Sequence, residues 1–303
     1  MSDRHPIIAI TGSSGAGTST VTRTFAAIFR REGVKAAVIE GDSFHRYDRA
    51  EMRTRQAEAE KAGNKHFSHF GSDNNLFGEL EALFRSYGET GQGQARKYLH
   101  NEQEAAPYQQ APGTFTAWEA LPGDTDLLFY EGLHGAVVTP EHDIARHVDL
   151  RIGVVPVINL EWIQKLWRDQ HQRGYSTEAV TDTILRRMPD YVHYIVPQFA
   201  QTHVNFQRVP MVDTSDPFIA RDIPSADESM VVIRFANPKG IDFPYLLGMI
   251  HDSWMSRANT IVVPGGKMEL AMQLIRSEER RVGKEGRYRW SPYHEQMKDA
   301  RHR

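Results

Sequence analysis

Apolar residues recur along the chain in two patterns, short β-branched runs and longer stretches with helical spacing. The first run, Pro6-Ile7-Ile8-Ala9-Ile10-Thr11, stops at Gly12, and the next stretch places apolar residues on one face of a helix over 19–31. A second apolar run follows over 34–40. This order of strand, glycine loop, helix and strand is typical of a βαβ unit with parallel strands.

Similar patterns predict the remaining elements of an α/β fold. Further helices are predicted over 76–87, 160–172, 177–187 and 267–276, and further strands over 126–131, 148–157, 230–235 and 260–263. Pro189 is expected to close the helix over 177–187, and the basic segment 280–303 is expected to be exposed. Since no linker or repeat divides the chain, we expect one domain over 1–303, with a mainly parallel, mixed central sheet flanked by helices.

The composition excludes several classes of protein. The 303 residues contain no cysteine, so disulfides, thiolate metal sites and thiol switches are ruled out. No apolar stretch approaches the ~20 residues of a membrane helix, and a net charge of −3 gives no general attraction to nucleic acid or anionic lipid. The first residues show no secretory signal pattern. We therefore expect a cytoplasmic protein with no nucleic-acid or membrane partner.

The segment between the first strand and the first helix has the composition of a phosphate-binding loop. It reads Gly12-Ser13-Ser14-Gly15-Ala16-Gly17-Thr18-Ser19-Thr20, a setting in which backbone N–H groups and the helix N-terminus face an anion. The pattern Gly-x-x-x-x-Gly-Lys-Ser/Thr is met except that Thr18 replaces the lysine. The whole segment is predicted to bind nucleotide, and the Ser19 hydroxyl to hold magnesium. The missing cation must come from elsewhere in the chain.

Two other uses of these glycines fit less well. A short-chain reductase needs a Tyr followed four residues later by Lys, and the chain has no such pair. A GTPase needs Asn-Lys-x-Asp, and the one Asn-Lys step, Asn64-Lys65-His66-Phe67, lacks the Asp. Phosphoryl transfer from a nucleotide to a small molecule is therefore favoured. A plain turn, and a protein that senses a nucleotide without turnover, stay open as alternatives.

Two acids are predicted at the carboxyl ends of parallel strands, where ligands of open α/β sheets bind. Asp42 follows the apolar run over 34–40 and is the candidate general base, which would accept a proton from a substrate hydroxyl. The alternative for Asp42 is a helix N-cap. Glu131 ends the strand over 126–131 and is a candidate metal-orienting acid, with a solvated side chain as the alternative.

A first basic cluster follows the candidate base within a few residues. It contains His45, Arg46, Arg49 and Arg53. Guanidinium groups bind phosphate dianions bidentately, so the cluster suits an acceptor that already carries a phosphate. The alternative is a solvated helix face.

A second basic cluster lies within a predicted lid over about 162–176. Its charged residues are Lys165, Arg168, Asp169 and Arg173, of which Lys165, either Arg168 or Asp169, and Arg173 are expected near one side of a helix. Closure of this segment over the nucleotide would supply the cation that the glycine loop lacks and would exclude water. A surface ion pair of at most ~1 kcal/mol is the alternative.

Taken together, these residues resemble the bacterial type of the phosphoribulokinase family, within the uridine kinase-like P-loop kinases. The resemblance extends over essentially the whole chain. Its most specific segments are Gly12-Ser13-Ser14-Gly15-Ala16-Gly17-Thr18-Ser19-Thr20, Glu40-Gly41-Asp42-Ser43-Phe44-His45-Arg46, Phe84-Arg85-Ser86-Tyr87-Gly88-Glu89-Thr90-Gly91, Tyr130-Glu131-Gly132-Leu133-His134-Gly135 and the segment from Arg168-Asp169 to Arg173-Gly174. The resemblance implies a P-loop nucleotide-kinase fold with a helical lid. It also implies ATP-dependent phosphorylation of ribulose 5-phosphate at the C1 hydroxyl, which gives ribulose 1,5-bisphosphate for Calvin-cycle carbon fixation. A uridine or pantothenate-type kinase is the alternative.

The resemblance also implies roles for single residues. By motif match, Asp42 would be the catalytic base and Asp169 a second essential acid near the metal or the hydroxyl, with the choice of proton acceptor between the two acids left open. Lys165 and Arg168 would be lid cations. Mg²⁺ would be held with the nucleotide by Ser19 and Glu131. The sugar phosphate would be bound by His45, Arg49, Tyr98 and His100, together with the lid residue Arg173.

Regulation is implied by the resemblance alone. Bacterial members are activated by NADH, inhibited by AMP and assembled from many subunits, so a high-order homo-oligomer is expected. Arg234, in the predicted strand over 230–235, is the candidate for carrying the effector signal. Plant-type members are controlled by a dithiol, and because this chain has no cysteine its control must act through ligands.

Overall fold

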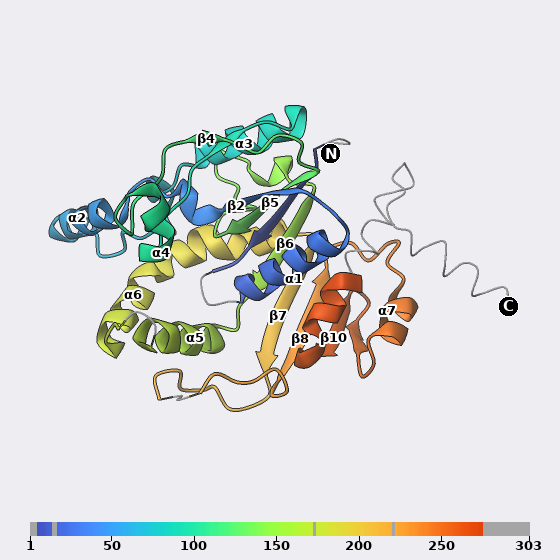
Figure 1. The fold of residues 1–303 in the computed structure, drawn as a ribbon. Coiled ribbons are helices and arrows are strands. Elements are labelled where there is room, and N and C mark those ends of the chain that lie inside the picture. The colour runs from blue at the N-terminus through green and yellow to red at the C-terminus, as the bar shows by residue number, and fades with distance from the viewer. Residues whose placement is uncertain (1–4, 14–16, 172–173, 220–221, 275–303) are drawn as a thin grey trace.

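The computed structural model describes residues 5–13, 17–171, 174–219 and 222–274 (Figure 1). Its centre is an eight-stranded sheet with the order β2-β5-β1-β6-β7-β8-β10-β9. The first five strands in this order are parallel: β2 (Ala36–Glu40), β5 (Leu127–Gly132), β1 (Ile7–Thr11), β6 (Leu150–Val155) and β7 (Val204–Pro210). An antiparallel extension follows: β8 (Ser229–Phe235), β10 (Thr260–Pro264) and β9 (Trp254–Arg257). The predicted mixed α/β sheet is confirmed.

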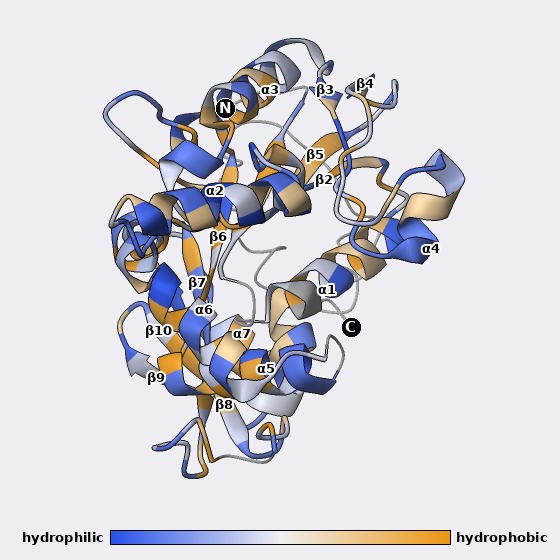
Figure 2. Ribbon diagram, turned by 90° about the vertical axis from the view of Figure 1, so that its left-hand side faces the viewer, coloured by the Kyte–Doolittle hydropathy of each residue, from blue (hydrophilic) through white to orange (hydrophobic). Residues whose placement is uncertain are grey.

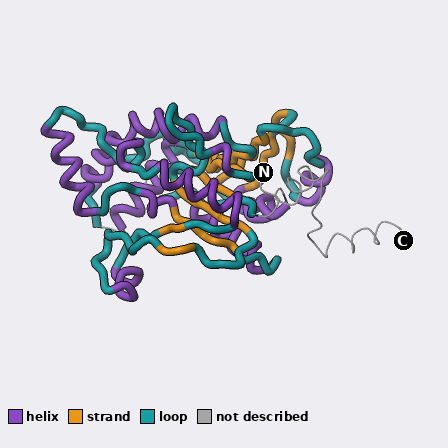
Figure 3. Tube along the Cα trace, turned by 90° about the horizontal axis from the view of Figure 1, so that it is seen from above, coloured by secondary structure: helices purple, strands orange, loops and turns teal. Residues whose placement is uncertain are grey.

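The central strand β1 is buried on both faces, which explains its unbroken apolar run. Ile8 and Ile10 point to a core shared with α1 (Thr18–Arg31), whereas Ile7 and Ala9 point to a core shared with α3 (Phe77–Thr90). The two helices therefore cover opposite faces of the sheet. Figure 2 shows the strands mostly in orange, and Figure 3 shows from above how helices surround them.

Further helices follow α1 along the chain, in addition to α3. They are α2 (Arg49–Lys61), α4 (Glu102–Ala105), α5 (Ile158–His171), α6 (Thr177–Asp190) and α7 (Phe243–Met249). Single 3-10 turns occur as η1 (Gly41–Phe44), η2 (Ser72–Asn74), η3 (Ala106–Tyr108), η4 (Ala145–His147), η6 (Val196–Ala200) and η7 (Gly265–Lys267). A small second sheet pairs β3 (Gln94–Ala95) with β4 (Glu119–Ala120). Within the described ranges, no helix is long and apolar enough to span a membrane.

The prediction that Pro189 closes a helix is wrong. Helix α6 includes Pro189, ends at Asp190 and continues as a π-helical turn, η5 (Tyr191–Ile195). Proline has no N–H to donate, and a change of helix type is one way in which a chain absorbs that loss.

The sequence patterns also missed several elements, among them the short β3, α4 and β4. Helix α2 buries only Met52, so it lacks the apolar stripe by which helices are recognised. Strands β7 and β9 and the short helix α7 were not predicted either. Part of the predicted helix over 267–276 is present, since 268–274 is helical, whereas the basic segment 280–303 lies outside the described residues.

Candidate active site

Four strands end at the edge of the sheet where the candidate residues lie. Because β2, β5, β1 and β6 are parallel neighbours, their carboxyl ends lie side by side. The glycine loop follows β1, Asp42 follows β2, Glu131 lies near the end of β5, and α5 follows β6 after a short connection. The sheet therefore brings together the predicted nucleotide loop, both predicted acids and the helix that carries Lys165.

Two glycines allow the backbones after β2 and β5 to approach closely. A Cβ atom on Gly41 would lie 2.8 Å from the Cα of Gly132 and 2.5 Å from the hydroxyl of Tyr130. The amide of Gly12 donates to the carbonyl of Gly132 at 3.2 Å, which joins the glycine loop to the same point. A side chain at Gly41 would push apart the ends of β2 and β5, which carry Asp42 and Glu131.

Buried polar groups support the glycine loop. The hydroxyl of Thr11 lies 3.0 Å from Oε1 of Gln198, and the hydroxyl of Ser13 donates to the carboxylate of Glu161 on α5. Gly17 has a φ of 99°, a left-handed conformation that glycine adopts without strain. The end of β1 is thus tied to η6 through Thr11, and the loop is tied to α5 through Ser13.

Glu131 lies beside this loop. Its carboxylate forms a hydrogen bond with the side chain of Thr18, the residue that replaces the usual lysine. Burial raises the pKa of Glu131, the Thr18 hydrogen bond opposes that rise, and the negative charge of Asp42 adds to it. The predicted nucleotide contacts of Ser14, Gly15, Ala16, Ser19 and Thr20 concern residues or side chains outside those that the structure describes.

Asp42 lies in η1, directly after β2, with 43% of its side chain exposed. Its Oδ1 is 3.2 Å from Nε2 of His45, and its Oδ2 is 4.0 Å from Nε2 of His100. Burial tends to raise the pKa of Asp42, but the hydrogen bond and charge of His45 outweigh it and hold the pKa well below its usual range. The N-cap alternative is wrong, because Glu40 occupies the N-cap position of η1 and Asp48 caps α2.

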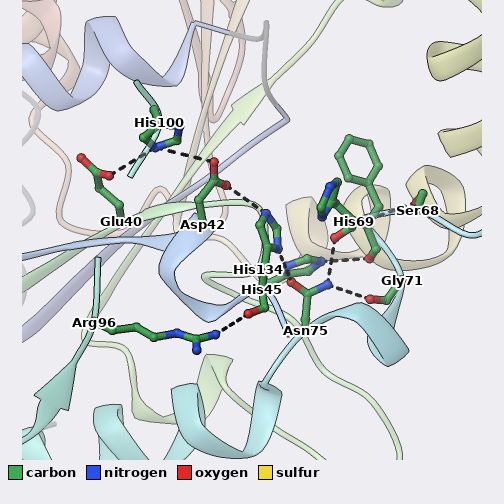
Figure 4. A network of polar contacts seen from close by, with 11 residues as sticks. Glu40, Asp42, His45, Ser68, His69, Gly71, Asn75, Arg96, His100 and His134 are labelled. Carbon is green, nitrogen blue, oxygen red and sulfur yellow. Dashed lines mark hydrogen bonds and ion pairs between the residues drawn. The ribbon is translucent and has the colours of Figure 1, made fainter. Parts of the chain in front are cut away.

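His45 is buried among groups from other segments (Figure 4). Its Nδ1 is 2.9 Å from Oδ1 of Asn75, and its ring lies 4.6 Å from the ring of His69. His134, which follows β5, is also buried, and its Nε2 is 3.0 Å from the carbonyl of Phe70. Burial lowers the pKa of His134 to about 3, so this ring is neutral at physiological pH.

His100 lies on the other side of Asp42. Its Nε2 is 3.7 Å from Oε2 of Glu40, and the interaction with Glu40 raises the pKa of His100 against the effect of burial. The ring of Tyr98 packs edge-on against His100 at 4.8 Å, and the guanidinium of Arg49 donates to the carbonyl of His100 at 2.9 Å. The four predicted sugar-phosphate residues within the described ranges therefore gather on the Asp42 side.

The other basic residues of these clusters lie differently. The guanidinium of Arg46 donates to the carbonyls of Asp73 and Asn75, so it holds the backbone. Arg53 is exposed on α2. Arg173 lies outside the described residues, so its predicted contact with substrate stays a prediction.

Lys165 and Asp169 form a buried ion pair one turn apart on α5. Lys165 Nζ is 2.5 Å from Oδ2 of Asp169, and Nε of Arg168 donates to the other carboxylate oxygen at 2.9 Å. Burial, followed by the charge of Arg187 on α6, lowers the pKa of Lys165 to about 8. Burial tends to raise the pKa of Asp169, but its bonds to the two cations lower it overall. The predicted lid segment 162–176 thus consists of most of α5 and the connection to α6, which packs on α5.

Sequence reasoning missed four residues of this region: Asn75, His69, Glu161 and Arg187. Arg187 ends the predicted helix over 177–187, so its basic side chain was a usable signal. Asn75 gave none, because it lies in a loop 30 residues from its partner His45.

Arg234 lies far from this edge. It is exposed on β8 and is paired in register with Asn205 of β7 and Thr260 of β10. Asn205 is near the start of β7, so Arg234 lies toward the amino-terminal edge of the parallel strands. An effector that bound near Arg234 would therefore lie away from the site around Asp42.

Comparisons with known proteins agree with this geometry. The family model described as Phosphoribulokinase / Uridine kinase family matches residues 7–215. A protein named "Phosphoribulokinase, plasmid" from Cupriavidus necator is 78% identical over 275 residues, which cover 91% of this chain and 94% of the relative. "Phosphoribulokinase 1" from Cereibacter sphaeroides is 67% identical over 275 residues, covering 91% and 95%.

A solved structure is similar over nearly the same extent. The structure titled phosphoribulokinase from Rhodobacter spheroides superposes with a TM-score of 0.82 at 64% sequence identity. The superposition covers 90% of this chain and 94% of the solved chain.

Proposed function

This chain belongs to the phosphoribulokinase/uridine kinase family, and on that premise we propose that it phosphorylates D-ribulose 5-phosphate at the C1 hydroxyl with ATP. The products are D-ribulose 1,5-bisphosphate and ADP, for Calvin-cycle carbon fixation. The identity of 63% or more with relatives named phosphoribulokinase over about nine tenths of the chain supports this substrate over uridine or pantothenate.

The observation that carries the catalytic assignment is the position of Asp42. Its carboxylate is partly exposed at the strand ends, next to the loop that would hold the nucleotide, and histidine contacts keep it ionised. An ionised, accessible carboxylate is able to accept the hydroxyl proton as the acceptor oxygen attacks the γ-phosphorus. Asp42 is therefore the proposed base.

The positive charge that Thr18 does not provide comes, in this proposal, from α5. Lys165 and Arg168 both contact Asp169, so their charges are fixed in direction before the nucleotide binds. With Arg173, they would stabilise the charge that develops on the transferred phosphoryl group. Asp169 is the proposed second essential acid, because it orients these cations.

The donor set at the end of β5 fits magnesium, which prefers oxygen ligands. Glu131 supplies a carboxylate beside Thr18 of the loop, and the Ser19 hydroxyl would be the second protein ligand. Bound Mg²⁺ would neutralise charge on the β- and γ-phosphates.

The acceptor would lie on the Asp42 side of the site. His45, Arg49, Tyr98 and His100 are the proposed sugar-phosphate residues, and the raised pKa of His100 favours a cation there at neutral pH. The finer proposals are activation by NADH, inhibition by AMP, transmission of the effector signal through Arg234, assembly into a high-order homo-oligomer and a cytoplasmic location.

The test is direct chromatography of ADP released from MgATP with ribulose 5-phosphate, and separately with uridine, with and without NADH. We expect ADP release with ribulose 5-phosphate but not with uridine. We also expect NADH to increase the rate of that release. Turnover with uridine would overturn the acceptor assignment, and ATP binding without turnover would favour a nucleotide sensor. A coupled assay that consumes NADH is unsuitable, because it would alter the effector concentration.

A further inference from the structure

Arg96 links the turn that carries Asp42 to a separate segment of the chain (Figure 4). It directly follows β3, and its Nε donates to the carbonyl of Ser43 at 2.9 Å. Its Nη2 donates to the carbonyl of His45 at 2.6 Å. One guanidinium, a rigid fork of donors, therefore holds two backbone carbonyls close after Asp42.

The turn η1 depends on such outside contacts for its shape. As a single 3-10 turn it has few hydrogen bonds of its own, among them the bond from the amide of His45 to the carbonyl of Asp42 at 3.2 Å. The amide of Leu76 donates to the carbonyl of Phe44 at 2.8 Å. Together with the two bonds of Arg96, this bond means that other segments hold the three successive carbonyls of 43–45. The directions in which Asp42 and His45 present their side chains are thus fixed from outside the turn.

Two aromatic rings pack against the guanidinium of Arg96. Its Cζ atom is 3.7 Å from the centre of the Phe115 ring and 5.1 Å from the centre of the Trp118 ring. A cation over an aromatic face is attracted to that face, so the rings hold the guanidinium in place. Trp118 also packs edge-on against the ring of Phe44 at 5.7 Å. Arg96 and Trp118 therefore brace the same turn.

The contacts of Arg96 continue to the proposed sugar-phosphate residues. The ring of Phe115 lies 5.3 Å from the ring of Tyr98, and the two residues face each other across an isolated antiparallel bridge. Tyr98 in turn packs edge-on against His100 at 4.8 Å, and Nε2 of His100 is 4.0 Å from Oδ2 of Asp42. The path of contacts that starts at Arg96 thus returns to Asp42, the residue whose turn Arg96 holds.

We propose that Arg96 is a positioning residue that holds the turn of Asp42 at a fixed position relative to the segment of Tyr98 and His100. The inference rests on the proposed kinase function. Efficient transfer needs the reacting atoms about 3–3.5 Å apart and aligned. Because Tyr98 and His100 would bind the acceptor and Asp42 would deprotonate it, a shift between the two segments would misplace the acceptor hydroxyl relative to its base.

Arg96→Met tests this role, because methionine keeps an unbranched stem against the aromatic rings but cannot donate to either carbonyl. We expect kcat, measured by ADP release, to fall roughly 10- to 100-fold and the KM for ribulose 5-phosphate to rise about three- to tenfold. The KM for MgATP should change by less than about twofold, because the contacts of Arg96 lie on the acceptor side of the site.

Arg151→Met is the matched control. Arg151 is half-buried like Arg96, and its guanidinium also donates to backbone carbonyls, those of Gln201 at 2.7 Å and Ala145 at 2.6 Å. It lies near the start of β6, whereas Asp42 lies at the carboxyl ends of the parallel strands. Its replacement should lower the melting temperature but leave kcat and both KM values unchanged. If Arg96→Met also changed only the melting temperature, Arg96 would merely stabilise the fold and the proposal would be wrong.

An Asp42→Asn background isolates the effect on the base. If Arg96 acts by placing the Asp42 carboxylate, its loss should matter less once that carboxylate is gone. We therefore expect Arg96→Met to lower the remaining kcat by less than about threefold in this background. An undiminished effect would mean that Arg96 does not act through Asp42, and would contradict the proposal.

Arg96→Lys covers the case in which Arg96→Met does not fold. Lysine keeps a positive charge near the aromatic rings, but its single ammonium group cannot reproduce the two directed bonds of the guanidinium. We expect a melting temperature near that of the unmutated protein, a kcat lower by about three- to tenfold and an unchanged KM for MgATP. If this is the variant that folds, a kcat equal to the unmutated value overturns the proposal. Failure of the proposed function itself would appear separately, as no turnover of ribulose 5-phosphate by the unmutated enzyme.

Discussion

The Asp42 side and the Lys165 side of the site hold their carboxylates in different ways. Asp42 is 43% exposed along its side chain, and its two histidines differ in origin, since His45 directly follows the same turn whereas His100 comes from a distant segment of the chain. The side chain of Asp169 is 5% exposed, and its cations Lys165 and Arg168 come from its own helix. The first arrangement can exchange a proton with an acceptor, whereas the second presents fixed charge. The comparison teaches that a single site can use one carboxylate as a base and a second carboxylate to orient cations.

The largest effect should follow from removal of the base. Asp42→Asn keeps the shape of the side chain but cannot accept the proton, so we expect kcat to fall about 10²- to 10⁴-fold, as measured by ADP release. The thermal unfolding midpoint should change little, because the side chain is partly exposed. Near-normal turnover in this variant would remove Asp42 as the base.

The next largest effect should come from removal of a cation on the Lys165 side. Lys165→Met removes a buried cation but leaves Asp169 paired with Arg168, so the protein should still fold. We expect kcat to fall about 10²- to 10³-fold with a smaller change in the affinity for MgATP, measured by calorimetry. A loss confined to MgATP affinity would mean that Lys165 only binds the nucleotide.

The same contrast explains what the sequence could predict. The Lys165–Asp169 pair follows from i,i+4 spacing on one helix, and the strand-end positions of Asp42 and Glu131 follow from the parallel βαβ pattern. His45 lies only three residues from its partner Asp42, but the groups that support the two sides of the site could not be derived in this way. The contact of His45 with Asn75 spans 30 residues, and Glu161 reaches Ser13 across 148 residues, so both depend on tertiary packing. Motif resemblance suggested His45 and His100, but not the Asn75 amide that contacts His45.

The pH dependence sharpens the role of Lys165. Its pKa in the folded protein is lowered to about 8, so the side chain loses its charge as the pH rises through about 8, and kcat should decline there. Lys165→Arg keeps a charge at this position and should move the decline to higher pH. The unfolded chain binds this proton more tightly, so the free energy of unfolding should rise with pH between about 8 and 10.5. An alkaline limb unchanged in Lys165→Arg would assign the decline to another group.

The junction between the two strands that carry the acids can be tested by stability. In Gly41→Ala the added Cβ would collide with Gly132 and the Tyr130 hydroxyl, so we expect the free energy of unfolding to fall by about 1–3 kcal/mol in urea titrations. Gly248→Ala on α7 is the control, because no atom lies within 4 Å of its added Cβ, and its stability should be equal or slightly higher. Equal stability of the two variants would mean that the strand ends adjust without cost.

The smallest effect should distinguish the two cations of α5. The side chain of Arg168 is 25% exposed against 9% for Lys165, and Asp169 keeps its bond to Lys165 when Arg168 is removed. A charge near solvent is screened more strongly than a buried one, so Arg168→Ala should lower kcat less than Lys165→Met does, by about tenfold. Arg186→Ala is a matched control, because Arg186 forms an ion pair with Asp182 on α6 and should leave kcat unchanged. If kcat fell as far in Arg168→Ala as in Lys165→Met, the burial of a cation would not determine how much that cation contributes to kcat.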